Sequence, residues 1–192
     1  MVAIIPEEVI AVQREAELLH TDIVVKKALM RMSEAITSAL EGINPLVLCV
    51  MNGGLVPTGW LLPLLHFPLQ LDYLHVTRYR GETCGHDLEW RARPKIPLQG
   101  RTILLIDDVY DAGMTLSQVA DDCLQQGSSR VYTAVLVKKM RMGAGIKPDI
   151  VGLEAPDRYL IGCGMDYKNY LRNLPAIYML PTKFDKKAHE HG

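Results

Sequence analysis

Three carboxylates, those of Asp107, Asp108 and Asp111, lie close together near the middle of the chain. The apolar run before them, residues 103–106, predicts a strand buried on both faces. Acidic side chains placed at the end of such a strand suit the binding of ribose hydroxyls, or of a divalent metal that accompanies phosphates. An acidic pair at a strand end is also common as a solvated exit from a sheet, so the pair alone does not decide its role.

The segment after the carboxylates predicts an anion-binding loop in front of a helix. Thr115 and Gln118 have the spacing of a capping box, so we expect a helix to begin there. Backbone N–H groups at such a helix start point outward and, together with the helix dipole, form a cradle for phosphate. The loop that would form this cradle consists of Asp111, Ala112, Gly113, Met114 and Thr115.

This order of strand, acidic pair and phosphate loop resembles the 5-phosphoribosyl diphosphate (PRPP) signature of the type I phosphoribosyltransferases. An aspartate at the position of Asp111 resembles the 6-oxopurine branch, the hypoxanthine-guanine phosphoribosyltransferases. The likeness extends over about residues 46–180. It implies a purine salvage enzyme that transfers the 5-phosphoribosyl group from PRPP to hypoxanthine or guanine. The products would be IMP or GMP and pyrophosphate, and the cofactor would be Mg²⁺.

Two further segments resemble parts of the family that contact PRPP. Asn52-Gly53-Gly54 follows a predicted strand and is similar to the loop that contacts pyrophosphate. Arg78 and Tyr79 begin a long polar segment, residues 78–98, of a length that is typical of functional lids. Tyr79 matches the tyrosine of the family's closing loop, whereas Arg78 stands where the family has Ser or Thr. By itself, each segment also fits an ordinary turn or a solvated hairpin.

The resemblance assigns the purine side of the site to the last third of the chain. Lys138 matches the lysine that contacts the 6-oxo group, Tyr159 would stack on the purine, and the backbone of Leu160 would read its edge. Asp166 and Arg172 match the family's magnesium-linked aspartate and pyrophosphate-contacting arginine. Outside this context, the same residues fit a surface lysine, a packed core aromatic, a turn carboxylate and a surface cation.

The likeness also implies roles for the carboxylates. Asp107 and Asp108 would hold the ribose and, with Asp166, the Mg²⁺ ion. Asp111 would be the catalytic residue, acting as a general base or proton-sharing partner at purine N7.

The elements that position these residues follow from hydrophobic periodicity. Strands that alternate with helices predict an α/β fold with a doubly wound, mostly parallel sheet and flanking helices, as in the type I phosphoribosyltransferases. Ligands bind such sheets at the carboxyl ends of the strands, where Asn52, the acidic pair and Lys138 fall. Helices are expected over residues 6–20 and 21–41. Strands are expected over residues 46–51, 69–77, 103–106, 131–137, 150–153, 159–163 and 177–180.

We expect one phosphoribosyltransferase domain over residues 1–192, with a flexible loop at about 78–98. A small hood would come from the N-terminal segment and from about residues 154–180. The chain is 48% hydrophobic and 22% charged, which is typical of a soluble domain. Its net charge of −1 gives no general attraction to nucleic acid or to an anionic membrane.

The remaining composition indicates a cytoplasmic protein. The four cysteines are scattered without a C-x-x-C pair, so neither a zinc site nor a disulfide framework is expected. The N-terminus has no signal-peptide pattern, and prolines interrupt the most apolar stretch, residues 55–71. The family resemblance implies a homo-oligomer, a dimer or tetramer. Two alternatives stay open: a xanthine-preferring phosphoribosyltransferase, and a PRPP-sensing regulator that binds RNA or DNA on the same fold.

Overall fold

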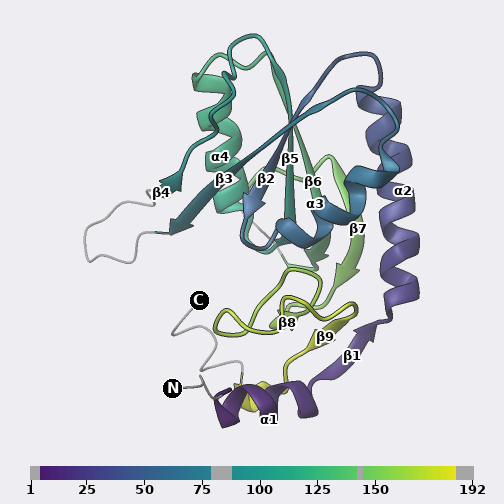
Figure 1. The fold of residues 1–192 in the computed structure, drawn as a ribbon. Coiled ribbons are helices and arrows are strands. Elements are labelled where there is room, and N and C mark those ends of the chain that lie inside the picture. Colours follow the sequence, from purple (N-terminus) through teal and green to yellow (C-terminus); the bar gives the residue numbers. More distant parts are fainter. Residues whose placement is uncertain (1–4, 79–87, 142–144, 185–192) are drawn as a thin grey trace.

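A computed structural model of the chain describes residues 5–78, 88–141 and 145–184. It is an α/β structure with a six-stranded sheet and a separate three-stranded sheet (Figure 1). In the large sheet the strand order is β4-β3-β2-β5-β6-β7. Neighbours run parallel except for β4, which is antiparallel to β3. The strands are β2 (Leu46–Met51), β3 (Gln70–Arg78), β4 (Leu88–Ala92), β5 (Thr102–Tyr110), β6 (Arg130–Lys139) and β7 (Ile150–Ala155).

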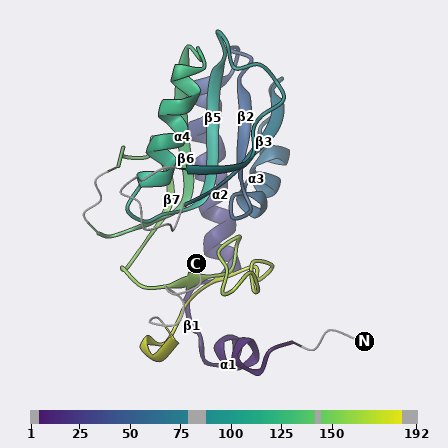
Figure 2. The same cartoon turned by 90° about the vertical axis from the view of Figure 1, so that its left-hand side faces the viewer.

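Helices cover both faces of this sheet (Figure 2). On one face lie α2 (Asp22–Leu40), α3 (Leu55–Leu61) and the short 3₁₀ helix η1 (Leu62–Leu64), and on the other lies α4 (Met114–Gln125). Residues 103–106 of β5 are all 0% exposed. Leu104 and Ile106 pack in the core under α2, whereas Ile103 and Leu105 pack in the core under α4. The predicted strand buried on both faces is therefore confirmed.

A smaller unit, which we call the hood, lies beyond the carboxyl ends of the parallel strands (Figure 1). It contains α1 (Glu7–Glu15) and an antiparallel sheet in the order β1-β9-β8, formed by β1 (Glu17–His20), β8 (Leu160–Ile161) and β9 (Ile177–Met179). The prediction of one helix over residues 6–20 was wrong. The helix ends at Glu15, because the next residues pair with β9 and so satisfy their backbone groups in a sheet.

Both predicted helix starts are confirmed to within one residue, but only one of the two predicted caps is correct. Thr21 caps α2 as expected, because its hydroxyl accepts from the Val24 N–H at 3.4 Å. At α4 the expected capping box was wrong: Gly113 is the N-cap, with φ +76° and no side-chain capping bond. Thr115 lies inside the first turn, and the Ser117 hydroxyl donates to the Gly113 carbonyl at 2.8 Å.

The polar segment predicted as a long loop, residues 78–98, contains strand β4. Its Leu88 and Trp90 alternate with exposed residues and pack against the core under α4. The Arg93 guanidinium lies 3.9 Å from the centroid of the Trp90 ring. The high polarity of the segment concealed this edge strand, because only one of its faces is buried. Tyr79 lies outside the described residues.

Within the described residues, the chain passes between the sheet and the hood at two places. One lies between β1 and α2, and the other lies between β7 and β8. The two passages are next to each other, since His20 Nε2 is 3.1 Å from the carbonyl oxygen of Glu154. No helix in the described part of the chain has both the length and the apolar character needed to cross a membrane.

Candidate active site

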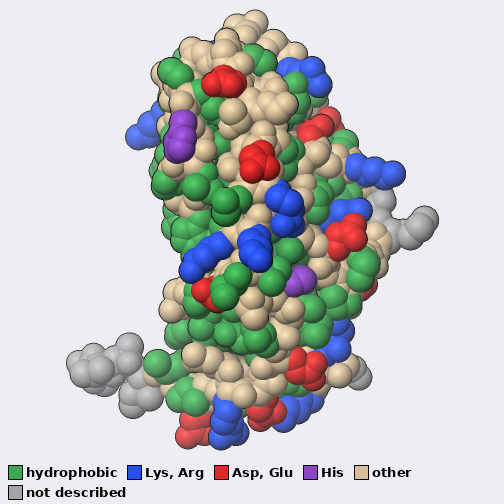
Figure 3. All heavy atoms as spheres, turned by 90° about the vertical axis from the view of Figure 1, so that its right-hand side faces the viewer, with side chains coloured by type: hydrophobic (Ala, Val, Ile, Leu, Met, Phe, Trp, Pro, Cys, Tyr) green, Lys and Arg blue, Asp and Glu red, His purple; other side chains and the backbone are tan. Residues whose placement is uncertain are grey.

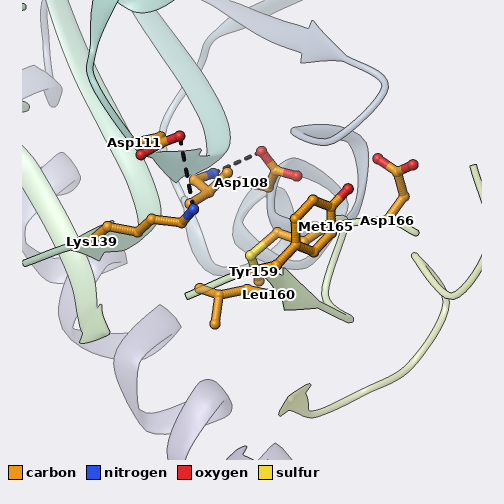
Figure 4. Close-up of a pocket in the computed structure, with 8 residues that line it drawn as sticks. Asp108, Asp111, Lys139, Tyr159, Leu160, Met165 and Asp166 are labelled. Atoms are coloured by element: carbon orange, nitrogen blue, oxygen red, sulfur yellow. Dashed lines mark hydrogen bonds and ion pairs between the residues drawn. The ribbon is translucent and has the colours of Figure 1, made fainter. Parts of the chain in front are cut away.

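A pocket lies between the carboxyl ends of the central strands and the hood (Figure 4). This is the position that the sheet topology favours, because the chain leaves β2 and β5 toward opposite sides of the sheet. Five residues predicted from sequence meet there. The described residues that line the pocket are Asp108, Val109, Asp111, Lys139, Tyr159, Leu160, Met165 and Asp166.

The acidic pair lies within β5 rather than after it. The strand continues to Tyr110, and Asp107 pairs with Val135 of β6. The Asp108 N–H donates to Asp107 Oδ1 at 2.9 Å, and the Val109 N–H donates to Asp108 Oδ1 at 2.7 Å. The two side chains are thus fixed by the backbone of the strand that carries them.

Burial controls the charge of this pair. It raises the pKa of both carboxyls, and that of Asp107 goes well above its ordinary value because the neighbouring charge of Asp108 adds to the effect. The positive charge of Arg172 opposes the rise at both residues. Two adjacent acids with raised pKa values hold protons readily, so a cation or hydroxyl-rich ligand would be needed to keep both ionised.

Glycines from both sides of the pocket close around Asp108. A Cβ atom on Gly53, just after β2, would collide with the Asp108 carboxylate. Gly164, in the hood, has φ +107°, and a Cβ atom there would collide with the Gly53 carbonyl oxygen. The sheet and the hood therefore approach each other through backbone atoms at this point.

Asp111 faces two cations. The Arg141 guanidinium lies 2.7 Å from Asp111 Oδ1. Lys139 Nζ lies 3.8 Å from Asp111 Oδ2 (Figure 4). Arg141 also lies 3.6 Å from Asp157 in the connection to β8. Neither cation was predicted from sequence as a site residue.

The lysine that lines the pocket is Lys139 and not Lys138. Successive residues of β6 point to opposite faces, so the two side chains diverge. Lys138 Nζ lies 3.6 Å from Glu154 on the neighbouring strand. The Lys139 side chain is only 9% exposed and reaches the pocket. Strand alternation was the signal that could have separated the two residues.

The hood supplies the opposite wall. Tyr159, Leu160 and Met165 give it an apolar surface, and Asp166 adds a carboxylate (Figure 4). Asp166 Oδ1 lies 2.6 Å from the Arg172 guanidinium, which also donates to the Gly164 carbonyl at 2.6 Å. Arg172 thus contacts the pocket through Asp166. Val109 and Met165 were not predicted, because apolar lining residues resemble core residues in a sequence.

The predicted phosphate loop, residues 111–115, adjoins the pocket, and Asp111 is its one member in the lining described above. The Gly145 N–H donates to the Ala112 carbonyl at 3.2 Å, and the Tyr110 hydroxyl donates to the Gly145 carbonyl at 3.2 Å. Through Gly145, these two hydrogen bonds connect the loop to the Tyr110 side chain at the end of β5. The pocket lining given above also does not include the predicted site residues Asn52, Gly54, Asp107, Met114 and Thr115.

The carboxylates fit a metal that is shared with a ligand. No group of three or more His, Cys, Asp or Glu side chains within residues 5–78, 88–141 and 145–184 forms a complete metal site. Mg²⁺ is commonly held by one or two carboxylates together with substrate phosphates and water. Asp108 and Asp166, on opposite walls, have the chemistry for such a shared site.

Comparison with known proteins agrees with this arrangement. A family model described as the phosphoribosyl transferase domain matches residues 17–168. The chain belongs to this family. It is 28% identical over 174 residues to the hypoxanthine-guanine phosphoribosyltransferase of Lactococcus lactis, covering 90% of this chain and 94% of that protein. It is also 28% identical over 158 residues to the hypoxanthine-guanine-xanthine phosphoribosyltransferase of Tritrichomonas foetus, covering 81% and 86%.

Solved structures support the fold of this phosphoribosyltransferase. The crystal structure of a hypoxanthine phosphoribosyltransferase from Staphylococcus aureus superimposes with a TM-score of 0.84 at 22% identity. The match covers 90% of this chain and 96% of that one. The α/β fold with a mostly parallel sheet, predicted from sequence, is thereby confirmed.

Proposed function

We propose that this phosphoribosyltransferase transfers the 5-phosphoribosyl group of PRPP to N9 of hypoxanthine or guanine. The products are IMP or GMP and pyrophosphate. The observation that carries the proposal is the pocket itself, where carboxylates on strand ends face an apolar wall with the aromatic ring of Tyr159. The names of the relatives from Lactococcus lactis and Tritrichomonas foetus support the same substrate class.

The two walls would divide the substrates between them. Asp107 and Asp108 would hold the ribose diol, the backbone of residues 111–115 would hold the 5′-phosphate, and Arg172 would contact pyrophosphate. On the hood side, Tyr159 would stack on the base while the backbone of Leu160 reads its edge. Asn52, Gly53, Gly54 and Tyr79 remain predicted pyrophosphate contacts.

In the reaction the bond from ribose C1 to the pyrophosphate oxygen breaks, and the bond from C1 to purine N9 forms. Positive charge develops on the sugar in such a transfer. Mg²⁺, held by Asp107, Asp108 and Asp166 together with the substrate, would offset the charge of the leaving pyrophosphate. Asp111 would accept or share the proton at purine N7. Arg141 and Lys139 pair with this carboxylate and fix its orientation.

A lysine at the 6-position would select a 6-oxopurine over adenine, since an ammonium group donates to a carbonyl oxygen but not to an amine. Lys138 is the lysine that the family pattern assigns to this role. Lys139 is the one that reaches the pocket, so both residues need testing.

The decisive experiment measures turnover with PRPP and Mg²⁺ against hypoxanthine, guanine, xanthine and adenine separately. We expect IMP and GMP formation and no reaction with adenine. Absence of turnover with every 6-oxopurine would overturn the proposal. Preference for xanthine is the second candidate, favoured by the name of the Tritrichomonas foetus relative.

A gel shift with RNA and DNA belongs beside this assay. On the face that carries α2, Lys and Arg side chains are interspersed with acidic and apolar ones (Figure 3). The acidic side chains among them reduce the positive potential that nucleic-acid binding favours. Binding to RNA without turnover would reverse the ranking in favour of a regulator.

Cys49, Cys123 and Cys163 are free and buried, which supports the predicted cytoplasmic location. The dimer or tetramer implied by family likeness needs a measurement of molecular mass in solution.

A further inference from the structure

A chain of contacts leads from the purine-side wall of the pocket to the N-terminal helix. The ring of Tyr159 meets that of Tyr167 edge to face, with centroids 6.4 Å apart and planes at 80°. Tyr167 is 0% exposed, and its hydroxyl donates to the Glu8 carboxylate at 2.6 Å. Glu8 belongs to α1, which contributes none of the described residues that line the pocket.

The Glu8 carboxylate makes two contacts with the same hood turn. Its Oε1 accepts from Tyr167, and its Oε2 lies 2.7 Å from Lys168 Nζ. Burial, followed by the hydrogen bond to Glu8, raises the pKa of the Tyr167 hydroxyl, so this group keeps its proton and continues to donate. Val9 and Val12, from the same helix, pack into the apolar cluster that contains Tyr167.

The turn held in this way has an unusual backbone. Lys168, Asn169 and Leu171 have φ values of +49°, +67° and +69°. Residues other than glycine adopt this left-handed region rarely and keep it only where their surroundings hold them. Asp166 lies directly before the turn, and its Oδ2 accepts from the Asn169 N–H at 2.6 Å. The shape of the turn therefore affects both an aromatic ring and a carboxylate of the pocket.

We propose that Glu8 and Tyr167 are positioning residues for base binding: through them, α1 sets the place of the Tyr159 ring. This inference rests on the proposed function. Glu8 and Tyr167 lie behind the pocket wall, so they act through Tyr159 and are not catalytic residues. The expected consequence is a selective effect on the affinity for the purine.

The test uses the full chain with Mg²⁺ and measures kcat and the separate KM values for hypoxanthine and PRPP. We expect Glu8→Ala and Tyr167→Phe each to raise the KM for hypoxanthine by about two- to tenfold, the range expected from one hydrogen bond. The KM for PRPP and kcat should change by less than about twofold. Glu8→Gln keeps an acceptor oxygen for Tyr167 and should restore most of the affinity.

Glu7→Ala is the matched control, because Glu7 lies in the same helical turn and is exposed. It should leave all three constants unchanged. The double variant Glu8→Ala/Tyr167→Phe should raise the KM for hypoxanthine by less than the product of the two single effects, since both changes remove one contact.

Three results would overturn the inference. One is a KM for hypoxanthine in Glu8→Ala that equals that of Glu7→Ala. Another is an equal weakening of hypoxanthine and PRPP together with a lower melting temperature, which would indicate general destabilisation. The third is failure of Glu8→Gln to restore affinity. If Tyr167→Phe does not fold, the three changes at Glu8 and Glu7 decide the question. Lack of turnover in the unmodified protein would instead refute the proposed function.

Discussion

The sheet side of the pocket and the hood side differ in what holds their side chains in place. On the sheet side, Asp108 and Lys139 project from neighbouring parallel strands whose backbone ladder fixes them. On the hood side, Tyr159 and Asp166 lie in short strands and turns, and side-chain contacts with Arg172, Tyr167 and α1 take the place of a ladder.

Because of this difference, the two sides are suited to different tasks in the reaction. Charges fixed by a buried sheet need no rearrangement when the reaction develops charge, so the sheet side is suited to electrostatic stabilisation. A wall held by a few side-chain contacts adjusts at low cost, so the hood side is suited to selecting and releasing a base. Changes to the sheet-side carboxylates should therefore affect kcat most strongly, and changes on the hood side should mainly affect binding.

The largest effect is expected at Asp111. Asp111→Asn should lower kcat by about 10²- to 10⁴-fold, the usual contribution of a general base, with little change in the KM for PRPP. Steady-state kinetics with varied PRPP and hypoxanthine would measure both. Asp157→Asn is the control, because Asp157 shares Arg141 with Asp111 but does not line the pocket. Equal losses in kcat and in PRPP binding would remove Asp111 from the chemistry.

Substitutions of the two adjacent lysines test which side chain of β6 faces the purine. Lys139→Met should raise the KM for hypoxanthine by about 10- to 100-fold, as expected for a hydrogen bond to a charged group. Lys138→Met should have a much smaller effect, because Lys138 pairs with Glu154 and is not among the residues that line the pocket. The opposite order of effects would mean that β6 presents Lys138 to the base when ligand is bound.

The contact between the two sides is tested at Gly164. Gly164→Ala should lower the free energy of unfolding by about 1–3 kcal/mol, because φ is +107° and the new methyl group meets the Gly53 carbonyl. Gly59→Ala in α3 has open space around it and should raise the free energy of unfolding by about 0.5–1 kcal/mol. Urea unfolding measures both. Equal stability of the Gly164 variant and the unmodified protein would argue against close backbone contact there.

The acidic pair should make stability depend on pH in a recognisable direction. Asp107 has a folded-state pKa well above its ordinary value of 3.8, so the folded protein binds more protons than the unfolded one between these two values. The associated stability is complete below the ordinary pKa and is lost as pH rises through the folded-state pKa. Asp107→Asn should remove this loss and so raise the free energy of unfolding at neutral pH.

Thermal unfolding of the ligand-free protein across the acidic and neutral range measures this effect. The same variant should lose activity, so stability and function would move in opposite directions, as is common at functional sites. A variant that is no more stable than the unmodified protein at neutral pH would show that Asp107 is not under strain there.

The parallel strands of the sheet side were the elements that the sequence predicted best. Runs such as residues 103–106 identify a strand by themselves, and parallel strands bring their carboxyl ends together by topology. The family likeness placed Asp108, Asp111, Tyr159, Leu160 and Asp166, which all line the pocket. The family likeness pointed to Lys138, whereas alternation along β6 directs the side chain of Lys139 toward the pocket.

The structure of the hood could not be predicted from local sequence patterns, because it depends on contacts between residues far apart in the chain. The segment after Glu15 has helical apolar spacing, yet it forms β1 because β9, more than 150 residues later, offers it a partner. The contact of Glu8 with Tyr167 joins residues that are equally distant in the chain. The capping box at Thr115 failed for another reason, since Gly113 already provides the turn into α4.

The side-by-side passages at His20 and Glu154 attach the hood to the sheet at one place, in the described part of the chain. The two connections define a hinge axis. Rotation of the hood about this axis would require less rearrangement of the chain than any other displacement of the hood relative to the sheet. Such a swing would carry Tyr159 and Asp166 along an arc while the strand-borne acids stay still. The distance from the Tyr159 ring to the Asp108 carboxylate would then depend on the angle of this rotation. Spectroscopic distance measurements across the pocket could follow it during turnover.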